Sequence, residues 1–294
     1  RMPSSTQVGK EKAGRMSIAN KDQEELWNGP GGKAWVRAQA LLDAAFTPFE
    51  RILVETATAA GAARVLDIGC GTGATTLAMS SALGADAECL GLDISGTMIT
   101  HARKRAAEAG SNAEFIVADA QTHEFAANHH DLITSRFGVM FFEDPVAAFR
   151  NLNRAAAPEA SMVLLSWRDP AENPFMTAAE AAARPLLPDL PVREPNARGQ
   201  FGFADSARVE RILSEAGWQD VTTDKLDVEC RFPLSALDLY VSLMGPVGYA
   251  MAQGVDEAIK EKVIEVVRAA FMEFAVGDEI VFTAACWKTA ARAA

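Results

Sequence analysis

The chain has 294 residues, of which 49% are hydrophobic, and this is enough for one large α/β domain with appended elements. Its formal net charge of −11 argues against a nucleic-acid partner, because proteins that bind nucleic acids usually present a basic face. The sequence has no apolar run of about 18 residues, so no membrane span is predicted. The cysteines lack metal-ligand spacing, and we expect reduced thiols in a cytoplasmic protein without a metal; they are Cys70, Cys89, Cys230 and Cys286.

The N-terminal stretch is polar and basic, and it lacks the apolar centre of a signal peptide. We expect residues 1–20 to be a disordered tail. Met16 is a candidate for the natural start, with residues 1–15 left over from cloning.

The next stretch, residues 21–60, is predicted to be mostly helical and to be broken at Gly29-Pro30-Gly31-Gly32. Apolar residues at helical spacing predict one helix over residues 33–45 and a further helix after Pro48. These helices either cover an edge of the sheet or close over a ligand as a cap, through the segment 27–35.

The stretch around which the chain is organised reads RVLDIGCGTG, from Arg64 to Gly73. An apolar run ends at Asp67, glycine then occupies every second position, and a helical pattern follows over 73–83. This pattern is typical of the first βα unit of a Rossmann-like sheet. Glycine suits the turn because the backbone bends sharply there and a ligand approaches it closely.

Two carboxylates accompany this turn. Asp67 lies two residues before the first glycine, where it can help to hold a cationic ligand directly or through water. Asp93 ends the next apolar run, at the position where a carboxylate takes the two hydroxyls of a ribose. A ligand with a ribose and a positive charge fits both, and S-adenosylmethionine (SAM) has these features.

Three motifs resemble the class I SAM-dependent methyltransferases, and most closely the broad ubiquinone/menaquinone-type group. They are VLDIGCGTG at 65–73, GLDIS at 91–95 and ADAQ at 118–121. The resemblance covers roughly residues 63–218 and returns at the last strand, and its motifs are specific for the cofactor but not for the methyl acceptor. It implies a set of cofactor-binding residues: Asp67, Gly69, Cys70, Gly71, Gly73, Asp93, Ile94, Met98, Asp119, Ala120, Ser135 and Phe137.

Several of these residues keep a second interpretation. Asp119 resembles the acceptor of the adenine amino group, but an aspartate there also suits a plain turn. Ile94 and Met98 pack against the adenine or belong to the core. Phe137 lies either near the sulfonium in a cation–π arrangement or in the core.

Alternating strands and helices predict an α/β fold, with a Rossmann-like sheet of seven mostly parallel strands, an antiparallel last strand and helices on both faces. The expected strands are 64–68, 87–92, 114–118, 131–135, 161–167, about 219–231 and 279–288. The expected helices are 73–83, 96–109, 145–156 and 205–216. Ligands of such sheets bind beyond the carboxyl ends of the strands.

We expect a single methyltransferase domain over residues 21–294. Its parts are an N-terminal cap (21–60), a SAM-binding core (61–168), a proline-rich lid insertion (169–204) with a helix at about 174–184, and a C-terminal part (205–294). The C-terminal part contains a helical insertion, 233–276, with helices at about 235–244 and 255–274. The insertion is either a wall of the lid or a dimer surface.

Arg136 and Arg168 end adjacent strands, where a pair of guanidiniums would suit a carboxylate or phosphate on the acceptor. The alternative is that they form salt bridges with Glu143, Asp144 or Asp169. His123 is a candidate base. The catalytic candidates are therefore Arg136, His123 and Arg168, and the acceptor-binding candidates are Trp27, Trp35, Arg136, Arg168, Phe175 and Phe201.

The resemblance implies transfer of the SAM methyl group to a small molecule by in-line displacement, with release of S-adenosylhomocysteine. The protein would mainly align and desolvate the reactants. The acceptor is either a quinone-like ring carbon or an oxygen or nitrogen of a secondary metabolite, and a homodimer is compatible with the sequence. A SAM-binding regulator without transfer activity is an alternative. An NAD-dependent oxidoreductase fits less well, because Asp67 precedes the turn and the spacing is GxGxG.

Overall fold

The computed structural model describes residues 20–294. The predicted disordered tail lies outside these residues except for Asn20, which is buried and hydrogen-bonded to Asp119 and Glu143. Asn20 was therefore wrongly assigned to the tail, because its polar side chain is held by partners about a hundred residues away.

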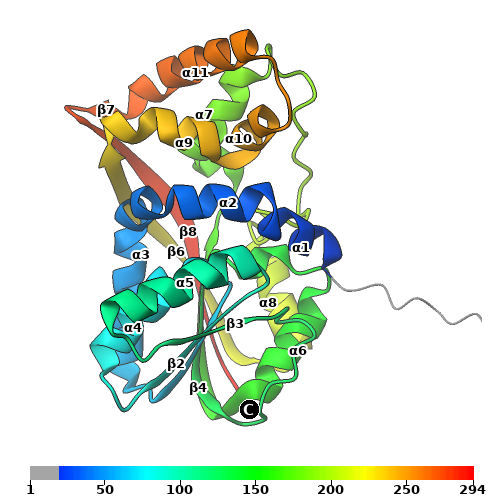
Figure 1. Cartoon of the computed structure of the whole chain (residues 1–294). Coiled ribbons are helices and arrows are strands. Elements are labelled where there is room, and N and C mark those ends of the chain that lie inside the picture. Colours follow the sequence, from blue (N-terminus) through cyan, green and yellow to red (C-terminus); the bar gives the residue numbers. More distant parts are fainter. Residues whose placement is uncertain (1–19) are drawn as a thin grey trace, which may run out of the picture.

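An eight-stranded sheet runs through the described residues, and seven of its strands follow the order β3-β2-β1-β4-β5-β8-β6 (Figure 1). These seven are β1 (Arg64–Ile68), β2 (Glu88–Asp93), β3 (Glu114–Val117), β4 (His130–Arg136), β5 (Ala156–Trp167), β6 (Gln219–Pro233) and β8 (Glu279–Arg292). A two-residue strand, β7 (Ala275–Val276), pairs with β8. The pairs from β3 to β5 are parallel, and β8 is antiparallel to both β5 and β6. The predicted fold class and the antiparallel last strand are confirmed.

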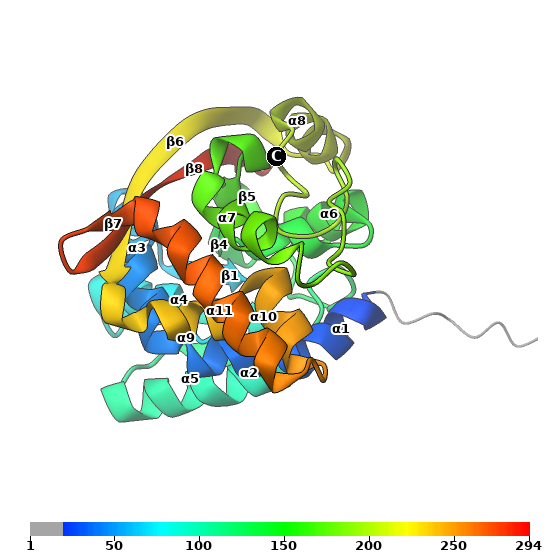
Figure 2. The ribbon, with the colours of Figure 1, turned by 90° about the horizontal axis from the view of Figure 1, so that it is seen from above.

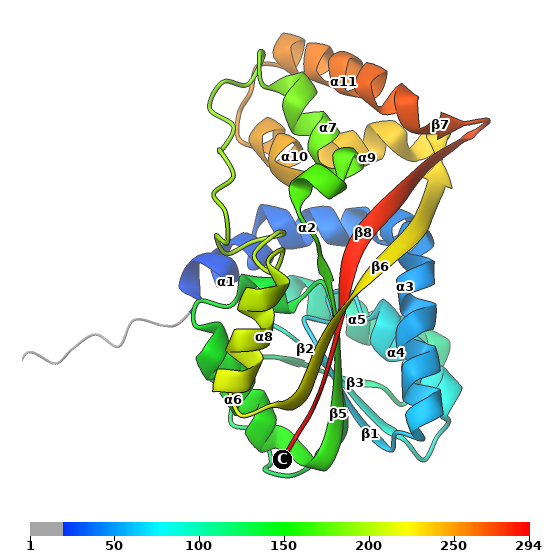
Figure 3. The ribbon, with the colours of Figure 1, turned by 180° about the vertical axis from the view of Figure 1, so that it is seen from behind.

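Helices cover both faces of this sheet. One face carries α3 (Gln39–Ala60), α4 (Ala74–Leu83) and α5 (Gly96–Ala109), and the other carries α6 (Pro145–Ala155) and α8 (Ser206–Glu215) (Figure 3). In α8 the apolar residues at helical spacing, Val209, Ile212 and Leu213, are the buried ones. Side-chain caps define where several helices start: the Ser95 hydroxyl accepts from Met98 N in α5, and the Asp144 carboxylate accepts from Ala147 N in α6.

The N-terminal helices differ from the prediction in three places, and the first is that the helix expected over 33–45 is divided at Ala38 between α2 (Pro30–Arg37) and α3 (Gln39–Ala60). Helix α1 (Lys21–Asn28) ends before Gly29, but α2 already begins at Pro30, so Gly31 and Gly32 lie inside a helix. A Cβ at Gly32 would lie 1.9 Å from the Trp27 carbonyl oxygen, so glycine here permits the close packing of α1 on α2. Pro48 lies inside α3 and does not start a new helix. The apolar face of α3 continues across it from Phe46 to Phe49, and burial of this face outweighs the lost backbone hydrogen bond.

A helical lobe lies over the carboxyl ends of the strands (Figure 2). It consists of α7 (Pro174–Ala183), α9 (Leu237–Leu243), α10 (Gly245–Ala252) and α11 (Glu257–Phe271). Helices α9 and α11 correspond to the two expected in the insertion 233–276, and α10 was not predicted. Two glycines and a proline in its eight residues conceal the helical pattern. Short 3-10 turns connect the elements: η1 (Val139–Phe141), η2 (Pro170–Glu172), η3 (Leu234–Ala236) and η4 (Met272–Phe274).

The lobe and the sheet share one aromatic core. The ring of Phe175 in α7 stacks on Phe282 of β8 with centroids 3.8 Å apart, and it also contacts Phe271 of α11 at 4.8 Å. The lobe thus packs on the carboxyl end of β6 and on the start of β8. None of the helices within residues 20–294 is long and apolar enough to cross a bilayer.

Candidate active site

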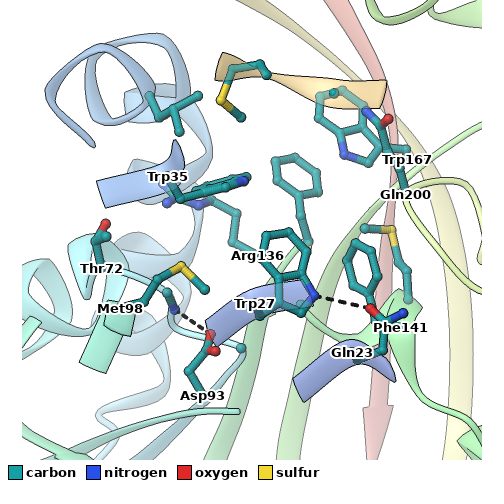
Figure 4. Close-up of a pocket in the computed structure, with 18 of the residues that line it drawn as sticks. Gln23, Trp27, Trp35, Thr72, Asp93, Met98, Arg136, Phe141, Trp167 and Gln200 are labelled. Atoms are coloured by element: carbon teal, nitrogen blue, oxygen red, sulfur yellow. Dashed lines mark hydrogen bonds between the residues drawn. The ribbon is translucent and has the colours of Figure 1, made fainter. Parts of the chain in front are cut away.

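A cavity of about 270 Å³ lies between the carboxyl ends of the strands and the helices above them (Figure 4). The glycine turn and the ends of β2 and β4 form its floor, and residues of α1, α2, α7 and α9 to α11 form its walls and roof. The cap, the lid and the helical insertion therefore all border the same space. The insertion 233–276 serves as a wall of this cavity.

The glycine turn and Asp93 are joined at one end of the cavity. Gly71 N donates to Asp93 Oδ2 at 2.9 Å (Figure 4), and Ser95 N donates to Oδ1 at 2.8 Å. Burial raises the pKa of Asp93 to about 6, although both N–H bonds act in the opposite direction. The turn needs glycine: Gly69 has a φ of +65°, and a Cβ there would lie 2.6 Å from the Cα of Gly138. Gly69, Cys70, Gly71 and Asp93, which were predicted to bind the cofactor, all line the cavity.

Asp67 does not line the cavity, contrary to the prediction that it holds a ligand. Its side chain is fully buried, and its carboxylate accepts hydrogen bonds from the hydroxyls of Thr75 (2.5 Å), Thr76 (2.7 Å) and Thr134 (3.3 Å). Burial raises the pKa of Asp67, and the threonine hydroxyls lower it. Asp67 thus ties α4 and β4 to the end of β1, and Thr75 is the member of this group that reaches the cavity.

Gly73 and Ser135 also lie outside the cavity wall. Gly73 is the N-cap of α4 with a φ of +85°, and a Cβ there would lie 2.9 Å from the ring of Phe115, so it allows α4 to start close to β3. The Ser135 hydroxyl donates to the Ile68 carbonyl at 2.8 Å and accepts from Gly138 N at 3.2 Å. Both residues shape the floor without facing a ligand.

The residues expected at the adenine also border the cavity. Ile94, Met98, Asp119 and Ala120 line the cavity. One oxygen of Asp119 accepts from Gln121 N at 2.9 Å, and the other accepts from the Asn20 side-chain amide at 2.9 Å. Sequence reasoning missed Asn20, because no local pattern marks an asparagine that bonds across about a hundred residues.

The N-terminal cap is fastened to the turn after β2. The Asn28 side chain accepts from Gly96 N at 2.7 Å and donates to the Ile94 carbonyl at 3.3 Å. The Ser95 hydroxyl donates to the Trp27 carbonyl at 2.5 Å. Trp27 and Trp35 line the cavity with ring centroids 6.3 Å apart (Figure 4). The cap therefore covers the space above Asp93.

The remaining part of the cavity, which we call the aromatic chamber, is lined mainly by aromatic and aliphatic side chains. Phe137 stacks on Trp167 at 4.4 Å and has a φ of +61°, a strained conformation for a phenylalanine. Of the two phenylalanines expected to bind the acceptor, Phe175 lines the chamber, whereas Phe201 does not, because its ring lies beneath the Arg193 guanidinium at 4.7 Å. The chamber residues are Trp35, Leu42, Phe46, Arg136, Phe137, Trp167, Phe175, Met176, Ala179, Glu180, Gln200, Tyr240, Met244, Val247, Tyr249 and Phe271.

The two arginines predicted to bind the acceptor lie in different environments. Arg168 is buried outside the cavity wall, where it bonds to Glu172 (2.7 Å) and Asp227 (2.6 Å) and lies over the Trp287 ring. The prediction that Arg168 binds the acceptor is therefore wrong. The alternative of ion pairing applies, with partners other than those expected. Arg136 lines the chamber, and the salt bridges considered for it do not occur in the described structure.

His123 does not reach the cavity. It lies in the turn after Asp119. Its backbone N–H donates to the Asp119 backbone carbonyl, and its ring packs edge-on against Phe125 with centroids 4.6 Å apart. Because His123 lies outside the cavity wall, its position does not support the prediction that it is the base. The sequence also missed most of the chamber, including Gln200 and Glu180, since these residues come from segments that only the fold brings together.

Comparisons with known proteins identify similar chains. Residues 65–159 match the family described as a methyltransferase domain. Aklanonic acid methyltransferase DauC of Streptomyces sp. (strain C5) is 40% identical over 104 residues, which are 35% of this chain and 47% of DauC. The ubiquinone/menaquinone biosynthesis C-methyltransferase UbiE of Pseudomonas aeruginosa (strain LESB58) is 28% identical over 184 residues, which are 59% of this chain and 72% of UbiE.

The fold is also found among solved structures. A protein whose structure was described for the conversion of a disulfide bond into a thioacetal group during echinomycin biosynthesis aligns with a TM-score of 0.54 and 21% identity, over 82% of this chain and 80% of the other. The matched part of this chain spans less than half of DauC. The family match and the relatives confirm the resemblance to class I SAM-dependent small-molecule methyltransferases, and the solved structure confirms the fold.

Proposed function

We propose that this protein is a SAM-dependent methyltransferase that transfers the methyl group to an apolar, ring-containing small molecule and releases S-adenosylhomocysteine. One observation carries the proposal: a single cavity runs from the glycine turn and Asp93 to the aromatic chamber. A cofactor held at the turn and an acceptor held in the chamber would thus meet inside the protein.

The residues at the turn fit SAM. Asp93 keeps its carboxylate at the cavity wall while two backbone N–H groups orient it, and this suits an acceptor for two ribose hydroxyls. Asp119 presents a second carboxylate beside Ala120 at the cavity wall, and a carboxylate there suits an adenine amino group. Gly71 lines the cavity with a φ of +56°, and a side chain there would occupy ligand space.

When bound, SAM supplies an electrophilic methyl group on a positively charged sulfur. The chain aligns the acceptor and excludes water, because Phe137, Trp167 and Phe175 form an apolar wall. The chamber offers no suitable base among the described residues: Glu180 is paired with Arg193, and burial raises the pKa of both chamber tyrosines, that of Tyr249 to about 12 and that of Tyr240 as well. The acceptor nucleophile should therefore be one that needs little deprotonation by the protein, such as an ionised oxygen, an enolate-like ring carbon or an amine.

The relatives favour a ring acceptor. DauC is named for aklanonic acid, and UbiE for ubiquinone and menaquinone biosynthesis. We extend this to a ring carbon or oxygen as the methylated atom. The proposal includes a cytoplasmic location, no nucleic-acid partner and no metal, and a homodimer is compatible with it.

Calorimetry with S-adenosylhomocysteine and with NAD tests the cofactor. We expect micromolar binding of S-adenosylhomocysteine, about −8 kcal/mol at 1 μM, and no competition by NAD. Tight NAD binding without S-adenosylhomocysteine heat would refute the proposal. S-adenosylhomocysteine release in the presence of aromatic acids, phenols and hydroquinones then tests transfer. Cofactor binding with no turnover across that panel would favour the SAM-binding regulator.

A further inference from the structure

Arg136 is a cation inside the chamber with no partner in the described structure. It ends β4, and its side chain lies among the aromatic side chains of the wall (Figure 4). Its Nη1 is closed off from solvent and has no hydrogen-bond partner within residues 20–294. The guanidinium lies over the Phe46 ring, with Cζ 5.8 Å from the centroid.

Other arginines in the interior are satisfied. The buried Arg168 bonds two carboxylates, and the half-buried Arg105 bonds Asp43 at 2.6 Å and the Thr72 carbonyl at 2.7 Å. A buried polar group without a partner is costly and therefore rare. Arg136 therefore differs from these arginines in having no hydrogen-bond or ion-pair partner within residues 20–294, and it is the one that faces the cavity.

The acidic groups around Arg136 do not neutralise it directly. Asp43, Asp67 and Glu50 attract its charge, while burial is the larger effect and lowers the pKa of Arg136, which remains protonated as guanidiniums do in proteins. The Asp43 carboxylate pairs with Arg105 and accepts a hydrogen bond from the Gln39 amide at 2.5 Å. The threonine hydroxyls occupy Asp67. Glu50 forms no ion pair in the part of the chain that the structure describes.

We propose that Arg136 binds a carboxylate that enters the cavity with a ligand. A guanidinium matches a carboxylate by two parallel N–H bonds, and the apolar surroundings strengthen such a pair. A phosphate dianion would call for further donors, and the chamber wall around Arg136 is aromatic. This inference rests on the proposed function, because both possible sources of the carboxylate belong to the reactants. One is the amino-acid tail of SAM, and the other is a carboxyl group on the ring acceptor.

Two substitutions separate charge from geometry. Arg136→Gln removes the cation, and Arg136→Lys keeps it but loses the fork. The matched control is Arg211→Gln, which makes the same charge change on α8 at a side chain that is 65% exposed. Because Arg136→Gln removes a desolvated charge without a partner, the melting temperature of the ligand-free variant should be equal to or above that of the wild type. A purely structural arginine would lower it.

Binding is measured by calorimetry with two pairs of probes. The first pair is S-adenosylhomocysteine and 5′-methylthioadenosine, which lacks the amino-acid tail. The second pair is 2-naphthoate and its neutral analogue 2-naphthamide, titrated into protein saturated with S-adenosylhomocysteine. The carboxylate-bearing probe of one pair should lose about tenfold to a hundredfold in affinity for Arg136→Gln, while its neutral partner and Arg211→Gln change little. Arg136→Lys should recover only part of the loss.

The pattern identifies the source of the carboxylate. A loss for S-adenosylhomocysteine alone assigns the carboxylate to the cofactor, and a loss for 2-naphthoate alone assigns it to the acceptor. Equal affinities of wild type and Arg136→Gln for both acids would overturn the inference, as would a lower melting temperature with no selective loss. Failure of the wild type to bind S-adenosylhomocysteine would instead refute the proposed function, and the naphthoate pair, titrated without it, would still test Arg136.

Discussion

At the scale of single residues, Asp93 joins the glycine turn to the ligand. Its two oxygens accept from Gly71 N and Ser95 N, and the same carboxylate lines the cavity. Asp93→Asn keeps the size of the side chain but removes the charge that strengthens bonds to ribose hydroxyls. We expect the affinity for S-adenosylhomocysteine to fall at least tenfold, in line with about 1.5–3 kcal/mol for a hydrogen bond to a charged group. Calorimetry measures it, and an unchanged affinity would place the ribose elsewhere.

The pKa of Asp93 adds a pH dependence. Burial raises this pKa from 3.8 to about 6, so the carboxylate takes up a proton as the pH falls through about 6. S-adenosylhomocysteine affinity should therefore decrease below about pH 6. The folded protein holds this proton more tightly than the unfolded chain, so the contribution of Asp93 to the stability of the ligand-free protein increases as the pH falls from about 6 to about 4.

Binding and stability thus respond to this carboxyl in opposite directions. Titrations between pH 5 and 7.5 should show the loss of affinity in the wild type and a much flatter profile in Asp93→Asn. Parallel profiles for the two proteins would show that another group controls binding.

Residues of the turn show how far a motif predicts a site. Gly71 and Asp93 lie where the motif indicated, because the strand–turn–helix geometry is local and places both at one edge of the sheet. Asp67 and Ser135 belong to the same motifs but bond to other parts of the fold. Sequence spacing shows that a side chain is near the turn, but it does not show whether a threonine hydroxyl or a ligand is its partner.

At the scale of elements, α1 and α2 act as a cap that is fastened to the sheet at both ends of α1. Asn28 connects the end of α1 to Gly96 N and to the Ile94 carbonyl beside the cofactor positions. Each bond contributes about 0.5–1.5 kcal/mol net, so Asn28→Ala should weaken S-adenosylhomocysteine binding by about threefold to tenfold, mainly through faster dissociation.

Stopped-flow dissociation and hydrogen exchange over residues 21–37 check this effect. The control is Asn153→Ala, which removes an exposed contact to the Gly217 carbonyl on the opposite face of the sheet. If Asn28→Ala and the control dissociate at the wild-type rate, the cap does not retain the ligand.

The elements themselves were largely predictable from the sequence, and the exceptions have physical reasons. The inner strands β1 and β2 are mostly apolar runs that contain Asp67 and Asp93 near their carboxyl ends, and a buried parallel strand requires such a run. Pro48 is misleading because tertiary burial of Phe46 and Phe49 maintains α3 through a residue that disfavours helices. Helix α10 escapes prediction because its glycines are tolerated where the lobe packs around it.

At the scale of the whole molecule, the chamber is a product of topology. Phe46, Arg136, Phe175 and Tyr240 line one space but come from α3, β4, α7 and α9. Each is compatible with a plain core position when only its neighbours in sequence are considered. The cofactor end could be predicted because one continuous motif builds it, whereas the acceptor end depends on how the lobe is placed over the sheet.

The same contacts predict that the lobe and the sheet unfold together. Phe175 is almost fully buried and stacks on Phe282 of β8, while it also packs on Phe271 of α11, so one ring joins the two parts. Phe175→Ala should destabilise the protein by about 3–5 kcal/mol, because it leaves a cavity between lobe and sheet. The expected decrease in melting temperature is on the order of 10 °C for a domain of this size. The control Leu239→Ala, on the same lobe but 40% exposed, should change stability by much less.

Differential scanning calorimetry of the wild type should show a single transition, since the aromatic core continues from the lobe into β6 and β8. Saturation with S-adenosylhomocysteine at about 100 times its Kd should raise the stability of this one transition by about 2.7 kcal/mol, because the cavity is bounded by both parts. In Phe175→Ala the weakened junction should let the lobe melt first, as a separate transition at lower temperature. Two transitions already in the wild type, with only the upper one shifted by ligand, would show that the lobe folds independently and that the acceptor chamber opens without disturbing the cofactor end.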